Sequence, residues 1–125
     1  MNIRIYLYVV CLFAGLYMSA AQALLLTDIQ LNSYLNQTLN ARIGMSGLKA
    51  GDLERLTVRL HNVDGMPDII TAKLKVEVME EGNGHYIHLT SSEKIREPLL
   101  AFLLELVWPE GRLIREYTLF VDPPQ

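Results

Sequence analysis

The sequence predicts an all-β domain, an antiparallel immunoglobulin-like β-sandwich of about seven short strands. Apolar and polar residues alternate with a period of two in several short segments, which is typical of strands that bury one face. Segments rich in glycine, proline and asparagine separate these strands at short intervals. The longest apolar run of the domain is followed at once by a Pro-Glu-Gly turn, so it predicts one arm of a hairpin rather than a helix.

Residues 1–23 have the layout of a secretory signal peptide. One arginine precedes the apolar run Ile5–Met18, which is short for a membrane-spanning helix, and Ala21 and Ala23 form an A-x-A cleavage site. An uncleaved membrane anchor is the alternative, because a single basic residue is a weak positive region. We predict cleavage after Ala23, export to the periplasm, and one domain at residues 24–125.

The composition restricts the class of protein. The single cysteine, Cys11, lies within the predicted signal peptide, so the exported domain depends on a hydrophobic core instead of disulfides. Its position inside the apolar run also makes it a poor candidate for lipidation. The formal net charge is −3 and no block of like charge occurs, so no nucleic-acid partner is predicted.

The first half of the domain contains three expected strands. Residues 29–35 and 39–45 each alternate apolar and polar side chains, with a turn at Asn36-Gln37 between them. Residues 46–53 carry two glycines and predict a connection, with one helical turn near its end. Alternation resumes over residues 56–60, which are therefore expected to form the third strand.

A long irregular stretch and a hairpin follow. Residues 61–68 (HNVDGMPD) are rich in turn-forming residues and predict a loop. Residues 72–78 show the clearest alternation in the chain, and residues 86–90 form the next expected strand. Between them, Glu81-Gly82-Asn83-Gly84 is typical of a tight hairpin turn, because its central residues tolerate positive φ angles.

The rest of the chain predicts a second hairpin. Ser91-Ser92 indicates a connection, and Ile95 marks a brief strand. Residues 99–108 are almost continuously apolar, with Glu105 as the one charged residue, and could be helical by composition alone. The Pro-Glu-Gly turn that follows favours an extended strand paired with residues 112–121.

No residue pattern predicts catalysis, a cofactor or a metal. His85 and His88 have an odd spacing on an expected strand, so they point to opposite faces and do not converge on a metal ion. Ser91 and Ser92 lack the G-x-S-x-G context of a catalytic nucleophile. Two carboxylates could meet in space, but nothing in the sequence selects a pair. We therefore predict a protein without enzymatic activity.

Charged and aromatic residues of the last hairpin are the candidate contact residues. Arg96-Glu97 and Arg115-Glu116 each place opposite charges on opposite sheet faces, because adjacent strand residues alternate. Exposed cross-strand ion pairs would be structural and worth roughly 0.2–1 kcal/mol each, and a polar recognition face is the functional alternative. Trp108 either plugs one end of the core or anchors an interface, where tryptophan is enriched.

Three segments resemble the periplasmic N-terminal domain of the FimV/HubP family. They are IQLNSYLNQTLNARI, LERLTVRL and SSEKIREPLLAFLLELVWPEGRLIREYTLFVDPP. In the first segment, Thr38 replaces a proline that we expect in that family. The matches in the last segment are Arg96-Glu97-Pro98, Trp108-Pro109, Gly111-Arg112-Leu113, Arg115-Glu116-Tyr117-Thr118 and Asp122-Pro123-Pro124. The resemblance covers almost the whole predicted domain.

The resemblance implies a β-sandwich protein that takes part in cell-pole organisation, type IV pilus assembly and twitching motility, and in some bacteria type II secretion. Members of the family are expected to continue into a peptidoglycan-binding LysM module, a membrane helix and an acidic cytoplasmic region. This sequence stops at Gln125, directly after the domain. We therefore expect either a stand-alone member of the family or a truncated one.

The leading hypothesis is a periplasmic module that binds a protein of the envelope, pilus or secretion machinery. The expected contact residues lie in the closing signature and are Arg96, Glu97, Trp108, Arg112, Arg115, Glu116 and Tyr117. One alternative is direct peptidoglycan binding through exposed aromatics such as Tyr34, Tyr86 and Tyr117. Another is an envelope hydrolase, which would need a convergent cluster of titratable residues in a pocket.

Overall fold

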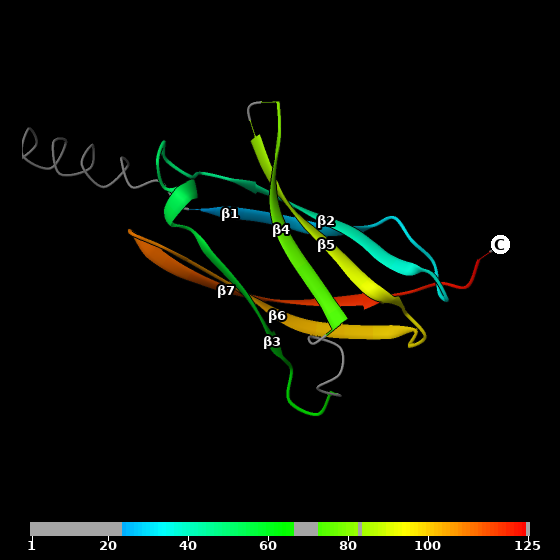
Figure 1. Cartoon of the computed structure of the whole chain (residues 1–125). Helices are drawn as coiled ribbons and strands as arrows, with labels where there is room; N and C mark the ends of the chain where they lie inside the picture. The colour runs from blue at the N-terminus through cyan, green and yellow to red at the C-terminus, as the bar shows by residue number, and fades with distance from the viewer. Residues whose placement is uncertain (1–23, 67–72, 83, 125) are drawn as a thin grey trace, which may run out of the picture.

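The computed structural model describes residues 24–66, 73–82 and 84–124, which form two antiparallel sheets packed face to face (Figure 1). The predicted signal peptide at residues 1–23 and the end of the predicted loop at 61–68 lie outside the described residues. The described part contains seven strands and one short 3-10 helix. The prediction of an all-β antiparallel sandwich is therefore confirmed.

One sheet has four strands in the order β1-β2-β5-β4, and all neighbours run antiparallel. Glu81 pairs with Gly84 across the tight connection between β4 and β5, which confirms the predicted hairpin. The strands of this sheet are β1 (Leu25–Leu31), β2 (Thr38–Ser46), β4 (Leu74–Glu81) and β5 (Gly84–Lys94).

The other sheet has three strands in the order β3-β6-β7. They are β3 (Thr57–Asn62), β6 (Leu99–Trp108) and β7 (Gly111–Phe120). The 3-10 helix η1 (Leu53–Arg55) precedes β3, where one helical turn was expected. Strand β6 is extended over its whole length, and Trp108 pairs with Gly111 at the start of β7. The predicted C-terminal hairpin is therefore confirmed.

The core lies between the sheets and depends on alternation along the three inner strands, β2, β5 and β6. Side chains of one parity on these strands point between the sheets and are buried. Burying one such side chain contributes roughly 1.5–3 kcal/mol, so this layer holds the sheets together. The largest fully buried side chains are Leu39, Ile43, Ile87, Leu89, Leu100, Phe102, Leu104 and Leu106.

The first strand differs from the prediction of residues 29–35, because β1 spans Leu25–Leu31. After β1 the backbone leaves the sheet, and the N–H of Leu35 donates to the carbonyl of Asp122 at 2.8 Å. Asn36 then adopts a positive φ of 67°, which confirms the turn predicted there. The late part of the predicted alternation therefore belongs to a loop whose hydrogen bonds are made outside the ladder.

The predicted connection at Ser91-Ser92 and the brief strand at Ile95 are wrong. β5 continues through both serines to Lys94, and the register of β2 and β5 shifts at this point. The Ser91 hydroxyl accepts a hydrogen bond from the N–H of Leu39 at 2.7 Å, so a side chain replaces a ladder acceptor at this irregularity. Ile95 is buried beyond the strand, and its N–H donates to the carbonyl of Gln37 at 2.9 Å.

Trp108 packs against the core at the end of β6, which agrees with the structural alternative for this residue. Its half-buried ring also covers Gly111, where an added Cβ would lie 3.1 Å from the ring. A side chain at position 111 would therefore require the tryptophan ring to shift by a few tenths of an ångström.

Candidate protein-binding face

The predicted contact residues do not form one site. Arg96 and Glu97 are exposed in the connection before β6, whereas Trp108 lies at the far end of the same strand. Because β6 has ten residues, these groups are separated by roughly 30 Å. Arg96 and Glu97 border a polar pocket that is also lined by Lys73, Ser92, Glu93 and Lys94.

Arg115 and Tyr117 point inward and join the two sheets where β7 lies against β1. A guanidinium nitrogen of Arg115 donates to the carbonyl of Leu26 at 2.8 Å, and another contacts the carboxylate of Asp28 at 2.6 Å. The Tyr117 hydroxyl donates to the carbonyl of Thr27 at 2.9 Å. We call this arrangement the β1/β7 clamp, and it gives both predicted contact residues a structural role.

The aromatic residues expected to contact peptidoglycan occupy different environments. Tyr117 is 4 % exposed, so its expected exposure is wrong, and burial raises the pKa of its hydroxyl. Tyr86 is half-buried, with the Arg42 guanidinium 4.1 Å from its ring centroid. Tyr34 is 48 % exposed, as that alternative requires.

The side of the three-stranded sheet that faces away from the core carries apolar side chains. Strand β6 is apolar on both faces, because Leu104 and Leu106 point into the core while Leu103 and Val107 point outward. On β7, Ile114 also points outward and is 46 % exposed. We call this surface the outer β6 face, and its central members are His61, Leu103, Glu105, Val107, Arg112 and Ile114.

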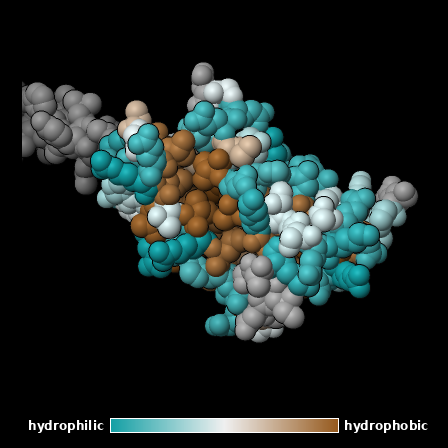
Figure 2. Space-filling model, viewed as in Figure 1, coloured by the Kyte–Doolittle hydropathy of each residue, from teal (hydrophilic) through white to brown (hydrophobic). Residues whose placement is uncertain are grey.

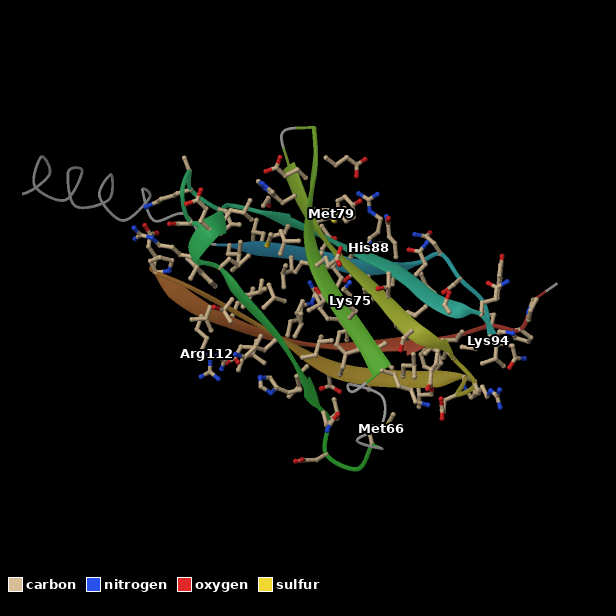
Figure 3. The ribbon with its side chains drawn as sticks, in the orientation of Figure 1. Met66, Lys75, Met79, His88, Lys94 and Arg112 are labelled. Carbon is tan, nitrogen blue, oxygen red and sulfur yellow. The ribbon has the colours of Figure 1, made fainter. Side chains whose placement is uncertain are left out.

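Glu105 lies at the centre of the outer β6 face and is buried, at 4 % exposure. His61 Nε2 of β3 lies 2.9 Å from one carboxylate oxygen, and Arg112 Nε of β7 lies 2.5 Å from the other. Arg112 projects from the side of its sheet that faces away from the core (Figure 3). A buried carboxylate is costly unless it is paired, and here both oxygens have partners. The Glu105 network therefore links all three strands through side chains.

The same contacts keep Glu105 ionised. The hydrogen bond with His61 and then that with Arg112 lower the pKa of Glu105, and together they outweigh burial, which raises it. A carboxyl group with a lowered pKa is a poor proton donor at neutral pH. Glu105 is therefore a paired carboxylate anion at the centre of the outer β6 face.

Two members of the network, Glu105 and His61, were not predicted as site residues. Glu105 was visible in the sequence as the one charge in an apolar run, and a charge that becomes buried needs a partner. His61 carried no such signal, because its approach to Glu105 depends on the pairing of β3 with β6. The predicted residue Glu116 is exposed on the same face, opposite Leu103.

The outer face of the four-stranded sheet is polar by contrast. Arg42 forms an ion pair with Glu81, and Lys75 forms one with Glu77 at 2.9 Å. Met79, labelled with Lys75 in Figure 3, is exposed but lies between the two glutamates on the same face of β4. This face therefore resembles an ordinary solvated sheet surface.

The histidines of β5 do not form a metal site with each other. His85 and His88 lie at positions of opposite parity, and His88 Nε2 hydrogen-bonds with the Asn40 side chain at 2.9 Å. Within residues 24–66, 73–82 and 84–124, no group of three or more His, Cys, Asp or Glu side chains could hold a metal ion. No helix in this part of the chain is long and apolar enough to span a membrane.

Comparison with known proteins shows the family. A family model described as "FimV N-terminal domain Ig-like domain" matches residues 24–124. Two relatives named "Motility hub protein FimV", from Pseudomonas aeruginosa strains PAO1 and UCBPP-PA14, are each 37% identical over 114 residues. Each alignment covers 83% of this chain and 12% of the relative, so the chain spans a small part of their length. No solved structure gives a significant match. The chain belongs to the FimV N-terminal domain family.

Proposed function

We propose that this chain is a non-enzymatic periplasmic protein-interaction module that serves type IV pilus assembly, twitching motility or polar envelope organisation. Support comes from family membership and from relatives whose name describes a motility hub. The signal-peptide pattern supports export, with cleavage after Ala23 and a domain at residues 24–125. The proposed partner is a protein of the pilus, secretion or envelope machinery, bound at the outer β6 face.

The observation that carries this proposal is the apolar character of β6 on both of its faces. In a two-layer sandwich, a strand needs apolar side chains toward the core, and its other face is ordinarily polar. Leu103, Val107 and Ile114 break that pattern on a surface that no described strand covers. Apolar patches with polar neighbours are typical of protein-binding sites, and the exposed Glu116, opposite Leu103, is such a neighbour.

The Glu105 network supports binding in a second way. Because the network joins β3, β6 and β7 through side chains, it holds the apolar residues of the face in a fixed arrangement. A preorganised surface loses less conformational entropy when a partner binds. The ionised and fully paired carboxylate at its centre offers no free acid or base, so a hydrolase is less well supported.

The test is photocrosslinking in the periplasm with the probe at position 116, which is exposed on the outer β6 face opposite Leu103 and leaves position 114 free for substitution. We expect the probe to capture proteins of the pilus or envelope machinery, and we expect Ile114→Asp to reduce capture about tenfold and to impair twitching. Met79→Asp is the matched control, because it places the same charge at an exposed apolar residue of the other sheet. Equal loss in both variants, or capture that Ile114→Asp leaves unchanged, would contradict the proposal.

Direct peptidoglycan binding is the second candidate, and one observation favours it. Tyr34 lines a shallow pocket together with Phe120, which is 73 % exposed. Exposed aromatic rings offer flat apolar surfaces of the kind that sugar rings contact. If the chain sediments with purified sacculi and Tyr34→Ala abolishes sedimentation, this candidate is supported. Protein that stays in the supernatant argues against it.

A further inference from the structure

On the side away from the β1/β7 clamp, each sheet ends in an edge strand, and these two strands, β3 and β4, lie close together. The four-stranded sheet ends at β4 and the three-stranded sheet ends at β3. The β1/β7 clamp aligns the sheets at their other ends, because it ties β7 directly to β1. β3 and β4 are therefore the strands that border the sandwich core on this side.

The core-facing side chains next to this position are half-buried. Val58 and Leu60 of β3, and Leu74, Val76 and Val78 of β4, pack against the core but remain partly exposed. Figure 2 shows the result as an apolar surface between β3 and β4. We call this surface the open side. It exposes part of the sandwich core to solvent, which is unfavourable unless something covers it.

The backbone of β3 has an edge on the open side to which another strand could hydrogen-bond. β3 pairs with β6 along one edge, and no described strand pairs with its other edge at residues 57–61. Such an edge can accept an added strand. β4 is also an edge strand, but ion pairs flank it: Lys75 with Glu77 at 2.9 Å and Lys73 with Glu93 at 3.0 Å. Charged side chains of this kind protect an edge strand from pairing.

The charge beside β3 differs from that beside β4. Arg59 points to the outer side of β3 and is exposed, and it forms no ion pair with any described residue. Arg55, at the end of η1, is likewise exposed and has no ion-pair partner among the described residues. An incoming strand would therefore meet guanidinium groups that form no ion pair with a described residue, and such groups favour carboxylates.

We propose that the free edge of β3 binds an extended segment of a partner protein by strand addition, and that this segment alternates apolar with acidic residues. Its apolar side chains cover the open side, and its acidic side chains lie beside Arg59. A segment of six residues matches the length of β3. This inference rests on the proposed function, because it names the chemistry and the binding mode of the partner.

The test uses the purified full chain and two synthetic peptides that serve as probes. One peptide alternates valine with glutamate, and the other alternates valine with lysine. We expect the glutamate peptide to bind about tenfold more tightly, because the lysine peptide replaces cross-strand attraction with repulsion. We also expect bound peptide to slow hydrogen exchange of amides in β3. Replacing with proline a middle residue of the glutamate peptide whose N–H faces β3 should abolish binding, since proline lacks that donor.

Variants identify the surface that binds the peptide. Arg59→Glu should reverse the preference between the two peptides, whereas Lys75→Glu, the matched control on β4, should leave the preference unchanged. Both side chains are exposed, but Arg59 lies opposite Glu105 on β6, so circular dichroism checks that Arg59→Glu remains folded. Equal affinity for the two peptides, exchange protection on β4 instead of β3, or an unchanged preference in Arg59→Glu would overturn the inference.

Two further results separate this inference from its rivals. A concentration-dependent dimer in sedimentation that protects the amides of β3 would assign the β3 edge to a second copy of the chain. This result would overturn the proposal that a segment of a partner protein binds there. Ile114→Asp should leave peptide binding intact, because Ile114 lies on β7, away from the β3 edge. Peptide binding without periplasmic capture by the probe at position 116 would therefore contradict the outer β6 face as the docking site. Capture without peptide binding would contradict strand addition alone.

Discussion

The two sides of the sandwich at which the edge strands of the sheets meet differ in the contacts that they make. Where β1 meets β7, Arg115 and Tyr117 reach across and hydrogen-bond to backbone carbonyls of the opposite sheet. Where β3 meets β4, apolar side chains such as Val58 and Val76 remain half-buried and reach the surface. Half-buried apolar side chains lie on both sides, since Leu26, Ile29 and Leu31 of β1 are also half-buried, but at the first side hydrogen bonds and an ion pair from Arg115 and Tyr117 join the sheets. The polar links of the first side therefore contribute to the stability of the fold, and the second side is the one for which we propose a partner strand.

The largest expected difference between the sides comes from truncating one inward side chain on each. Tyr117→Ala should lower the free energy of unfolding by about 3–5 kcal/mol, because it removes a buried ring that stacks on Phe102 and the hydrogen bond to Thr27. Val58→Ala should cost about 1 kcal/mol or less, since Val58 is half-buried. Urea unfolding monitored by circular dichroism measures both. Similar losses at the two positions would show that the open side is as tightly packed as the clamp.

A smaller difference in the free energy of unfolding is expected between variants of Arg115, in the β1/β7 clamp, and of Arg59, on β3. Arg115→Met should lower the free energy of unfolding by about 1.5–3 kcal/mol, because it removes charge-assisted hydrogen bonds to the backbone of β1 and the contact with Asp28. Arg59→Met should change it by no more than about 0.5 kcal/mol, because Arg59 has no described ion-pair partner. The same unfolding assay compares the two variants. If Arg59→Met lowers the free energy of unfolding as much as Arg115→Met does, Arg59 makes stabilising contacts in the folded chain. That result would contradict its description as an arginine without an ion-pair partner among the described residues.

The smallest effect, and the one that depends on pH, concerns the Glu105 network that ties the edge strand β3 to its sheet. The folded chain lowers the pKa of Glu105 below the usual value of about 4.3, so ionised Glu105 stabilises the fold above that pH. This contribution is lost as the pH falls through the lowered pKa. Glu105→Gln should therefore reduce stability at pH 7 and differ less from the natural chain in acid.

Urea unfolding at pH 7 and at about pH 3 measures this dependence. Glu116→Gln is the control, because Glu116 is exposed on the same face and has no ion pair with a described residue. If Glu105→Gln differs from the natural chain by the same amount at both pH values, the network does not stabilise the ionised carboxylate. Because the pKa of Glu105 is lower in the folded state, its contribution to the free energy of unfolding is present at pH 7 and decreases in acid.

Local patterns predicted most of the strands. The alternation in residues 39–45 marks the buried face of β2, and the turn after Trp108 identifies residues 99–108 as a strand rather than a helix. The predictions went wrong where side chains or distant carbonyls replace ladder partners. Ser91 lies within β5, where its hydroxyl accepts a hydrogen bond from the N–H of Leu39. Leu35 lies outside β1, and its N–H donates a hydrogen bond to the carbonyl of Asp122. Neither partner is near in the sequence, so a local pattern does not reveal it.

For the candidate contact residues, too, the local pattern did not reveal contacts with residues that are distant in the sequence. Arg112 and Glu116 lie on the outer β6 face, whereas Arg115 and Tyr117 point inward and close the fold. The period of two assigns these residues to two faces, but it does not say which face meets the other sheet. That choice follows from the packing of β7 against β1.

The sequence by itself determined the class of fold, the strands of the inner layer, the turns and the family resemblance. These features depend on hydrophobic periodicity and turn chemistry, which act over a few neighbouring residues. Only the tertiary structure decided that Glu105 is buried between His61 and Arg112, that the clamp closes one side, and that β3 keeps a free edge beside apolar side chains. These features depend on which strands are neighbours and on how many strands each sheet holds. Strand order is set by the packing of the whole chain, because contacts between residues far apart in sequence determine it.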